Sequence, residues 1–67
     1  MRVRIRISKL MGERKMNMRE LSQLTGIRPN TISNLYYEEA KRIEINQIAA
    51  LCSALKCSVG DLFEVEE

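Results

Sequence analysis

The sequence contains no histidine and no tryptophan, and its 67 residues include one proline, three glycines, one phenylalanine and two tyrosines. Histidine is a common general base and metal ligand, and two cysteines without it do not make a zinc site. No glycine-rich phosphate loop is present either. The composition therefore predicts no enzyme and no metal or cofactor site.

Long apolar runs are also missing. No stretch approaches the roughly 20 apolar residues that a membrane-spanning helix needs, and no signal peptide opens the chain. We therefore expect one small cytoplasmic domain over residues 1–67, with an aliphatic core and no membrane partner. Cys52 and Cys57 should be reduced, buried small hydrophobes that point in different directions.

The net charge of +2 is small but unevenly distributed. Residues 1–19 hold seven basic side chains against the single acid Glu13, whereas residues 60–67 hold four acids and no base. A basic end of this kind can attract a polyanion, or it can pair with the acidic tail. For Arg2, Arg4 and Arg6 the sequence favours neither alternative.

The two ends of the chain alternate between apolar and charged residues. "VRIRI" places Val3, Ile5 and then Ile7 on one face and arginines on the other, which is typical of a strand. "LFEVEE" is the other alternating stretch, and its opposite charge favours cross-strand pairs. We expect a small two-stranded sheet, within one chain or between two.

Five helices are predicted between these ends. The first begins near Ile7 and ends near Lys15. In the second, "MRELSQLT", Asn17 and Glu20 form a capping box and Gly26 ends the helix in the left-handed conformation. The apolar residues Leu21 and Leu24 of this helix, and Ile27 in the turn that follows, are expected to face the core.

The third helix should cover about residues 29–37, because Pro29 suits the first position of a helix. Ile32 and Leu35 form its inner face, and of the adjacent tyrosines Tyr36 should point inward and Tyr37 outward. Two short helices joined by a turn containing glycine make a helix-turn-helix. The outer face is polar: Asn30, Ser33, Asn34 and Tyr37.

The remaining pattern indicates an exposed linker and two further helices. "YEEAKR", which contains Glu38 and Glu39, is the linker. A fourth helix of about three turns carries an apolar stripe, and Ser58 with Asp61 caps a short fifth helix that includes Leu62 and Phe63. The stripe consists of Ile45, Ile48, Leu51, Cys52 and Leu55.

"MNMRELSQLTGIRPNTISNLY" and "IAALCSALKCSVGDLF" together resemble the Cro/C1-type helix-turn-helix family of phage-repressor-like bacterial regulators, over about residues 7–63. The resemblance implies an all-α, five-helix, lambda-repressor-like DNA-binding domain, to which the alternating ends would add the small sheet. It also implies that the third helix reads the major groove of a palindromic operator, usually as a homodimer.

Carried over position by position, the resemblance implies two sets of contacts with double-stranded DNA. Asparagine can bond adenine through N6 and N7, and Asn30 and Asn34 lie four apart on one helix face, so they can meet successive base pairs. The bases would be contacted by Arg28, Pro29, Asn30, Ser33 and Asn34. The phosphates would be contacted by Asn17, Met18, Thr31, Tyr37 and Lys41.

The sequence departs from the family at three places. Met18 stands where members often have a glutamine that binds phosphate, and Pro29 stands where they often have a polar base reader. Met11 and Tyr36 replace an arginine–glutamate pair, and we predict that they make a sulfur–ring contact instead.

Two functions remain open. The first is a sequence-specific transcriptional regulator, a homodimer held by residues 2–6, residues 62–66 and the apolar Leu62 and Phe63. Phe63 would then lie between subunits or in its own core. The alternative is an antitoxin or co-regulator that acts mainly on a protein partner. A chain this small, with no sensor domain, favours that alternative.

Overall fold

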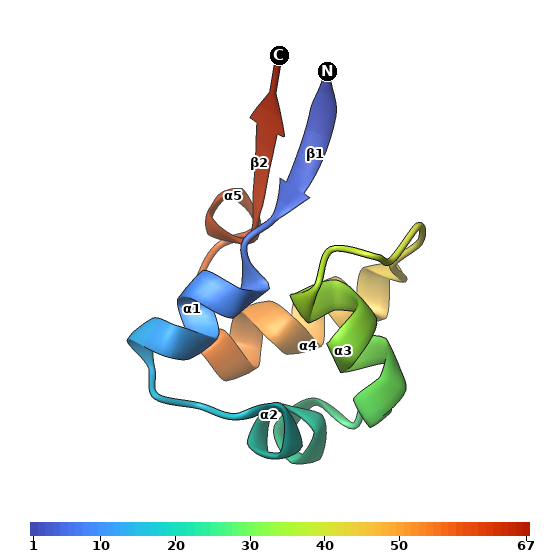
Figure 1. Cartoon of the computed structure of the whole chain (residues 1–67). Coiled ribbons are helices and arrows are strands. Elements are labelled where there is room, and N and C mark those ends of the chain that lie inside the picture. Colours follow the sequence, from blue (N-terminus) through green and yellow to red (C-terminus); the bar gives the residue numbers. More distant parts are fainter.

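The computed structural model describes all residues from Met1 to Glu67. The chain folds into five helices and a small two-stranded antiparallel sheet, which confirms the predicted fold class (Figure 1). In chain order the elements are β1 (Arg2–Ile5), α1 (Ile7–Glu13), α2 (Met18–Thr25), α3 (Pro29–Tyr36), α4 (Ile45–Leu55), α5 (Val59–Leu62) and β2 (Phe63–Glu66).

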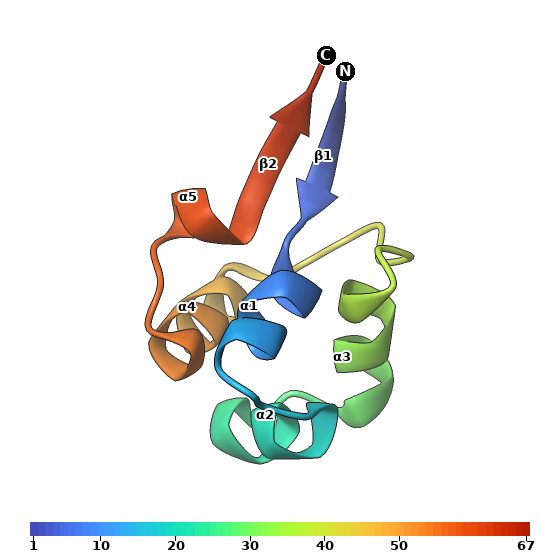
Figure 2. The ribbon, with the colours of Figure 1, turned by 60° about the vertical axis from the view of Figure 1, so that its left-hand side comes forward.

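The two strands form a ribbon within a single chain. Arg2 pairs with Glu66, Val3 with Val65, Arg4 with Glu64 and Ile5 with Phe63. The ribbon projects away from the helices, and both ends of the chain lie at its tip (Figures 1 and 2). The two alternating segments are therefore partners, as their patterns predicted.

The core is aliphatic and draws on all five helices. Ten hydrophobic residues are buried, and no polar or charged residue is buried with them. Ile27, in the turn between α2 and α3, is one of the ten and anchors that turn as predicted. The core residues are Ile7, Leu10, Met11, Leu21, Ile27, Ile32, Leu35, Leu51, Leu55 and Leu62.

The predicted helix caps are present. Asn17 Oδ1 accepts the Glu20 N–H at 2.8 Å, and Glu20 Oε1 accepts the Asn17 N–H at 3.2 Å. Ser58 and Asp61 cap α5 in the same reciprocal way, and these hydrogen bonds lower the pKa of Asp61. Because each cap satisfies otherwise unpaired N–H groups, these short helices start at defined residues.

α1 ends at Glu13, close to Lys15 as expected, and Lys15 adopts a left-handed conformation (φ 52°) that cannot continue the helix. Three other expectations about the helices were wrong. Phe63 begins β2 rather than lying in α5. Leu24 is 64% exposed, and Ile45 is 83% exposed.

The two exposed residues lie outside the stripes that face the core. In α2 the inward stripe consists of residues 18, 21, 22 and 25. The Ser22 hydroxyl donates to the Ile27 carbonyl in the turn, and the Thr25 hydroxyl donates to the Leu21 carbonyl one turn back in α2, so both polar side chains are satisfied on this side. In α4 the stripe begins only at Ile48, one turn after the helix starts. A prediction based only on the apolar character of Leu24 and Ile45 therefore placed both residues on the wrong face of their helices.

The two cysteines lie close together, contrary to the expectation that they point in different directions. The Cys57 N–H donates to the Cys52 carbonyl at 3.0 Å, and the Cys52 thiol lies near enough to contribute to the raised pKa of Cys57. Lys56, left-handed at φ 51°, turns the chain back over the last turn of α4. Both thiols are free and half-buried, and burial raises the pKa of Cys57.

Glu38 is half-buried, although its linker was expected to be exposed. Its carboxylate accepts from Arg4 Nε at 2.8 Å, from Arg4 Nη2 at 2.9 Å and from the Ile5 N–H at 3.0 Å. Arg4 also donates to Glu66 at 2.6 Å, and Arg6 lies 3.4 Å from Glu64. The arginines Arg4 and Arg6 thus pair with acids of this chain.

Candidate nucleic-acid interface

The turn between α2 and α3 has a conformation set by hydrogen bonds and by one glycine. Gly26 is left-handed (φ 73°), and its N–H donates to the Ser22 carbonyl. Thr25 Oγ1 accepts the Ile27 N–H at 3.2 Å, and Ser22 Oγ donates to the Ile27 carbonyl. With Ile27 buried beneath it, this turn fixes the direction in which α3 leaves.

α3 presents a polar outer face, as predicted. Ile32 and Leu35 are fully buried, whereas Asn30 and Asn34 are exposed and Ser33 is half-buried. The side-chain amides of Asn30 and Asn34 make no hydrogen bond within the chain. Two amides on one exposed helix face, four residues apart, can therefore bond an external partner without first breaking a contact.

The other predicted base-contact residues lie at the start of α3. Arg28 and Pro29 are exposed, and Pro29 occupies the first helical position. Arg28 is the N-cap residue, and its guanidinium makes no hydrogen bond or ion pair within the chain, so it remains available. The structure therefore brings all five predicted base-contact residues onto one continuous strip.

The predicted phosphate-contact residues differ in their exposure and in the groups that they can offer to a phosphate. Asn17 is exposed, and although its oxygen caps α2, its amide N–H groups remain free to donate. Met18 is half-buried against the core and has no donor. Thr31 is half-buried beside α4, and Lys41 is exposed in the linker beyond α3. These residues frame the strip, but Met18 can offer it only apolar contact.

The two tyrosines divide as predicted. Tyr36 packs against the core, whereas Tyr37 is exposed at the end of α3. Their rings meet edge to face, with centroids 5.0 Å apart and planes at 75°. This contact limits the freedom of the Tyr37 ring and leaves its side chain in contact with solvent.

Polar residues of α4 adjoin the strip, and the sequence did not identify them. A hollow of about 350 Å³ lies between the first turns of α3 and α4, and its lining includes Arg28, Thr31, Glu44, Asn46 and Gln47. The Glu44 N–H donates to Gln47 Oε1 at 3.2 Å. Asn46 and Gln47 come near Arg28 only in the folded chain, so spacing along the sequence carried no signal for them.

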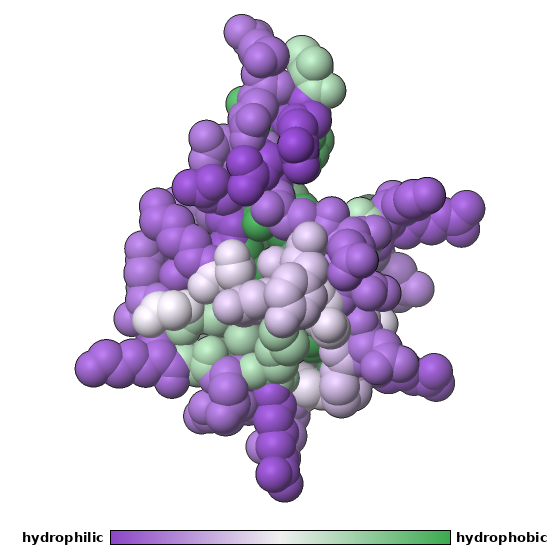
Figure 3. Space-filling model, in the orientation of Figure 1, coloured by the Kyte–Doolittle hydropathy of each residue, from purple (hydrophilic) through white to green (hydrophobic).

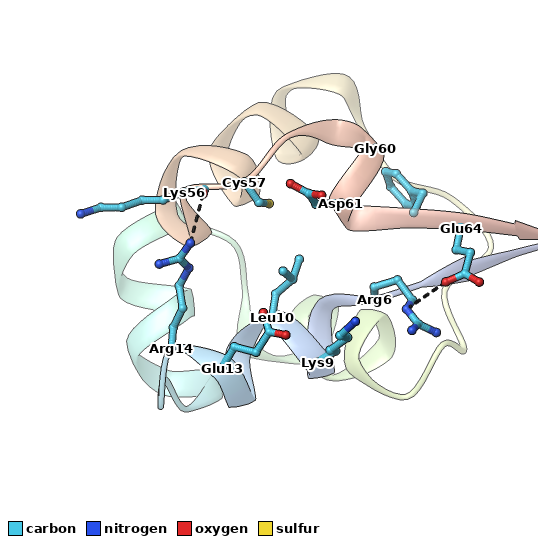
Figure 4. A pocket seen from close by; sticks show the side chains of 11 residues that line it. Arg6, Lys9, Leu10, Glu13, Arg14, Lys56, Cys57, Gly60, Asp61 and Glu64 are labelled. Atoms are coloured by element: carbon cyan, nitrogen blue, oxygen red, sulfur yellow. Dashed lines mark hydrogen bonds and ion pairs between the residues drawn. The ribbon is translucent and has the colours of Figure 1, made fainter.

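A second hollow, of about 420 Å³, lies between α1 and the turn from α4 into α5 (Figure 4). Its charged groups are partly used within the fold: Arg14 donates to the Lys56 carbonyl at 3.1 Å, and Arg6 pairs with Glu64. Cys57 and Asp61 also line it. This mixed lining shares no residue with the strip on α3.

The structure groups no three histidine, cysteine, aspartate or glutamate side chains as metal ligands. Its longest helix, α4, has 11 residues, and none is long and apolar enough to cross a membrane.

Comparison with known proteins gives two matches. Residues 6–67 match the family of Cro/C1-type HTH DNA-binding domains. An uncharacterized HTH-type transcriptional regulator, YozG of Bacillus subtilis (strain 168), is 38% identical over 64 residues, which are 96% of this chain and 76% of that protein. The chain is thus similar to this regulator over nearly its whole length.

Proposed function

Because the chain belongs to the Cro/C1-type helix-turn-helix family, which comprises DNA-binding transcription regulators and not enzymes, we propose that it binds a palindromic operator as a homodimer. In this proposal α3 enters the major groove of each half-site. Action on DNA supports a cytoplasmic location.

The observation that carries the proposal is the outer strip of α3. Its amides are exposed and unpaired, while Ile27, Ile32 and Leu35 hold the helix from behind. A helix that reads bases must offer free donors and acceptors on a rigid support. The strip has both properties.

We assign the base contacts to Arg28, Pro29, Asn30, Ser33 and Asn34. Asn30 and Asn34 are the specific readers, since a bidentate amide distinguishes adenine from the other bases. Pro29 has no donor and makes only van der Waals contact. Arg28 bonds either a guanine or a phosphate, so its role depends on how deeply the helix enters the groove.

Phosphate contacts would fix the register of α3. Asn17 and Tyr37 have polar groups at the two ends of the helix-turn-helix, Thr31 supplies a hydroxyl, and Lys41 supplies a positive charge. Met18 would lie beside a phosphate without bonding it. The family's usual glutamine contact is then missing here, which lowers affinity without changing sequence preference.

A homodimer follows from the small size of the recognition surface. One short helix reads few base pairs, so a single copy has limited binding energy and specificity. Two copies related by a two-fold axis, with their recognition helices about 34 Å apart, would read successive major grooves on one face of the duplex.

A second candidate function is an antitoxin or co-regulator that acts mainly on another protein. The observation favouring it is an apolar groove of about 180 Å³, lined in part by Leu35, Ala40 and Ile43. Protein-binding sites are often apolar at their centre. This candidate predicts that DNA binding is absent or secondary.

Titration of random duplex DNA at several salt concentrations separates the two candidates. A DNA regulator should bind weakly, and log K should fall linearly with log salt by about 0.9 per phosphate neutralised. No binding to duplex DNA at 50 mM salt would reject the regulator and leave the protein-binding candidate.

Selection of bound fragments from random DNA then tests the finer proposal. We expect enrichment of an inverted repeat whose half-site centres lie about 10 base pairs, or a multiple of that, apart. Enrichment of single, unpaired half-sites would contradict the palindrome while leaving sequence-specific binding in place.

A further inference from the structure

One face of the terminal ribbon is apolar and open to solvent. Val3 and Val65 are direct partners across the two strands, so their side chains lie on the same face. They are 58% and 56% exposed. An isolated two-stranded ribbon is at best marginally stable in water, and apolar residues on a projecting ribbon gain most by being covered.

The same face leads into the apolar groove at the base of the ribbon. Val3, Ile5 and Phe63 form the ribbon side of this groove, and Leu35, Ala40 and Ile43 form the side made by α3 and the linker. The groove is therefore continuous with the exposed valine pair. Together they make one apolar surface, which we call the ribbon face.

The opposite face of the ribbon is charged, and much of its charge is already neutralised. Arg4 is bonded to Glu38 and Glu66, and Arg6 pairs with Glu64. Figure 3 shows this hydrophilic side of the ribbon, with hydrophobic residues only at its margins. Since Arg4 and Arg6 already have ion-pair partners, covering the charged face would gain less free energy than covering the apolar face.

Unpaired charges of opposite sign flank the ribbon face at its two ends. Lys41 and Arg42 border the groove at the base, are exposed, and have no carboxylate within ion-pair distance. At the tip, Glu67 is exposed and in none of the ion pairs, and the strand alternation, continued by one residue, places it on the same face as Val65. Arg2 is also exposed at the tip, but it lies with Arg4 on the opposite face. A ribbon face with a positive base and a negative Glu67 at its far end is complementary to an inverted copy of itself.

We propose that the ribbon face is the interface between two copies of this chain. The ribbons lie antiparallel, so the Val3–Val65 pair of each copy covers the groove of the other, and Glu67 at the tip of each reaches Arg42 of the other. A two-fold interface requires one surface to carry both halves of the contact, and the ribbon face does so. The inference rests on the proposed function, for which it supplies the second reading helix.

The outer strip of α3 stays free in this arrangement. The groove takes Leu35 from the inner side of α3, whereas Asn30 and Asn34 point outward and are not part of its lining. The dimer contact and the DNA contact therefore use different sides of the same helix.

A charge placed on the ribbon face should separate the two copies. Val3→Lys and Val65→Lys would each bury an unpaired ammonium in the interface and should weaken the dimer on the order of 100-fold. Val59→Lys on α5 is the matched control, because Val59 is a valine of equal exposure (55%) off the ribbon. Sedimentation equilibrium from 1 to 200 μM gives the dissociation constants, and circular dichroism verifies the helices.

Three results would overturn the proposal: a monomeric intact protein at the highest concentration, undiminished dimers of both ribbon variants, or a control weakened as much as they are. If the ribbon variants unfold, the unmodified protein can still test whether the ribbon face forms the dimer. In a mixture of isotope-labelled and unlabelled copies, intermolecular NMR contacts must link the Val3 and Val65 methyl groups to Leu35, Ala40 or Ile43 of the other copy. Dimers without such contacts would refute the ribbon face.

The same variants distinguish a failure of the dimer interface from a failure of the DNA-binding function. Weak binding to random duplex DNA should survive in Val3→Lys, because the strip on α3 is intact. A dimer that forms through the ribbon face but binds no DNA would reject the regulator and leave the interface standing. A protein that binds DNA but dimerises through another surface would reject the ribbon face and leave the regulator proposal standing.

Discussion

The charged face of the terminal ribbon and the outer strip of α3 are both polar, but they use their polar groups differently. In the ribbon, Arg4 is bonded to two carboxylates and Arg6 to a third. On α3, the amides of Asn30 and Asn34 are bonded to nothing in the chain, although they are equally able to form hydrogen bonds.

This difference separates polar side chains that hold the fold from those available to a partner. Removing a ribbon charge should change stability and leave base preference unaltered. Removing an amide from α3 should change base preference and leave stability unaltered. Single substitutions in the two regions test this division.

Asn30→Ala and Asn34→Ala should have the largest effect, and the effect should appear in DNA binding. Loss of a bidentate base contact should weaken specific binding by about 1–3 kcal/mol and relax the preference at one base pair. Affinity for random DNA and the melting temperature should hardly change. Titrations with the selected operator and with scrambled DNA measure both quantities.

Ser53→Ala is the control for these two variants. It truncates an exposed polar side chain on α4 that lines none of the hollows and lies outside the strip, so it should leave the preference at every base pair unchanged. Unaltered base preference in both α3 variants would show that the strip does not read DNA.

Gly26→Ala should destabilise the protein, because the turn before α3 needs a left-handed residue (φ 73°). Alanine in this conformation costs about 1–2 kcal/mol. Gly12→Ala should instead stabilise by about 0.5–1 kcal/mol, since Gly12 lies within α1, its φ is not positive, and its Cβ would meet no atom within 4 Å. Urea unfolding of both variants measures the two opposite changes, and equal signs would contradict the role given to the turn.

Met11 and Tyr36 should be coupled through a sulfur–ring contact. Met11 is buried in the core, and Tyr36 packs against the same cluster. Met11→Leu and Tyr36→Leu, alone and together, form a double-mutant cycle in urea unfolding, and we expect a coupling free energy of about 0.3–1.5 kcal/mol. Strictly additive effects would mean that the two side chains only share the core.

Glu38→Gln should have the smallest effect, because Glu38 and Arg4 both remain in contact with water. The hydrogen bonds from Arg4 lower the pKa of Glu38 from an ordinary value near 4.5 to about 2. Its stabilising contribution is therefore complete above pH 4.5 and is lost as the pH falls from 4.5 toward 2.

Unfolding measured at pH values from 7 to 2 should show this loss as a narrowing difference between the unmodified protein and Glu38→Gln. A difference that stays constant with pH would exclude the ionised carboxylate as the cause. Base preference should be the same in both proteins, in keeping with the ribbon's structural role.

The sequence predicted local features of the fold well because their causes are local. Asn17 with Glu20, Gly26 and Pro29 each act through the backbone of residues within four positions, so their roles can be read from spacing. The pairing of the ribbon was also predictable, since only two segments alternate and their charges are opposite.

The wrong or missing predictions concern residues whose surroundings are set by tertiary packing. Leu24 lies outside the inward stripe of α2, which two hydroxyl-bearing residues complete in its place. Glu38 is drawn out of solvent by Arg4, which is 34 positions away. The hollow beside Arg28 combines α3 with α4. None of these contacts leaves a periodic signal in the sequence.

The pairing of β1 with β2 also has a consequence for the order of folding. Arg4 and Glu66 are 62 positions apart, and β2 is synthesised after all five helices. Contacts this distant form slowly because a long loop must close, whereas the neighbouring helices can pack early. β1 therefore remains unpaired until β2 has formed. In the folded protein the first and last strands are joined by hydrogen bonds and ion pairs. A short covalent link between Met1 and Glu67 would keep the two strands together and should speed folding.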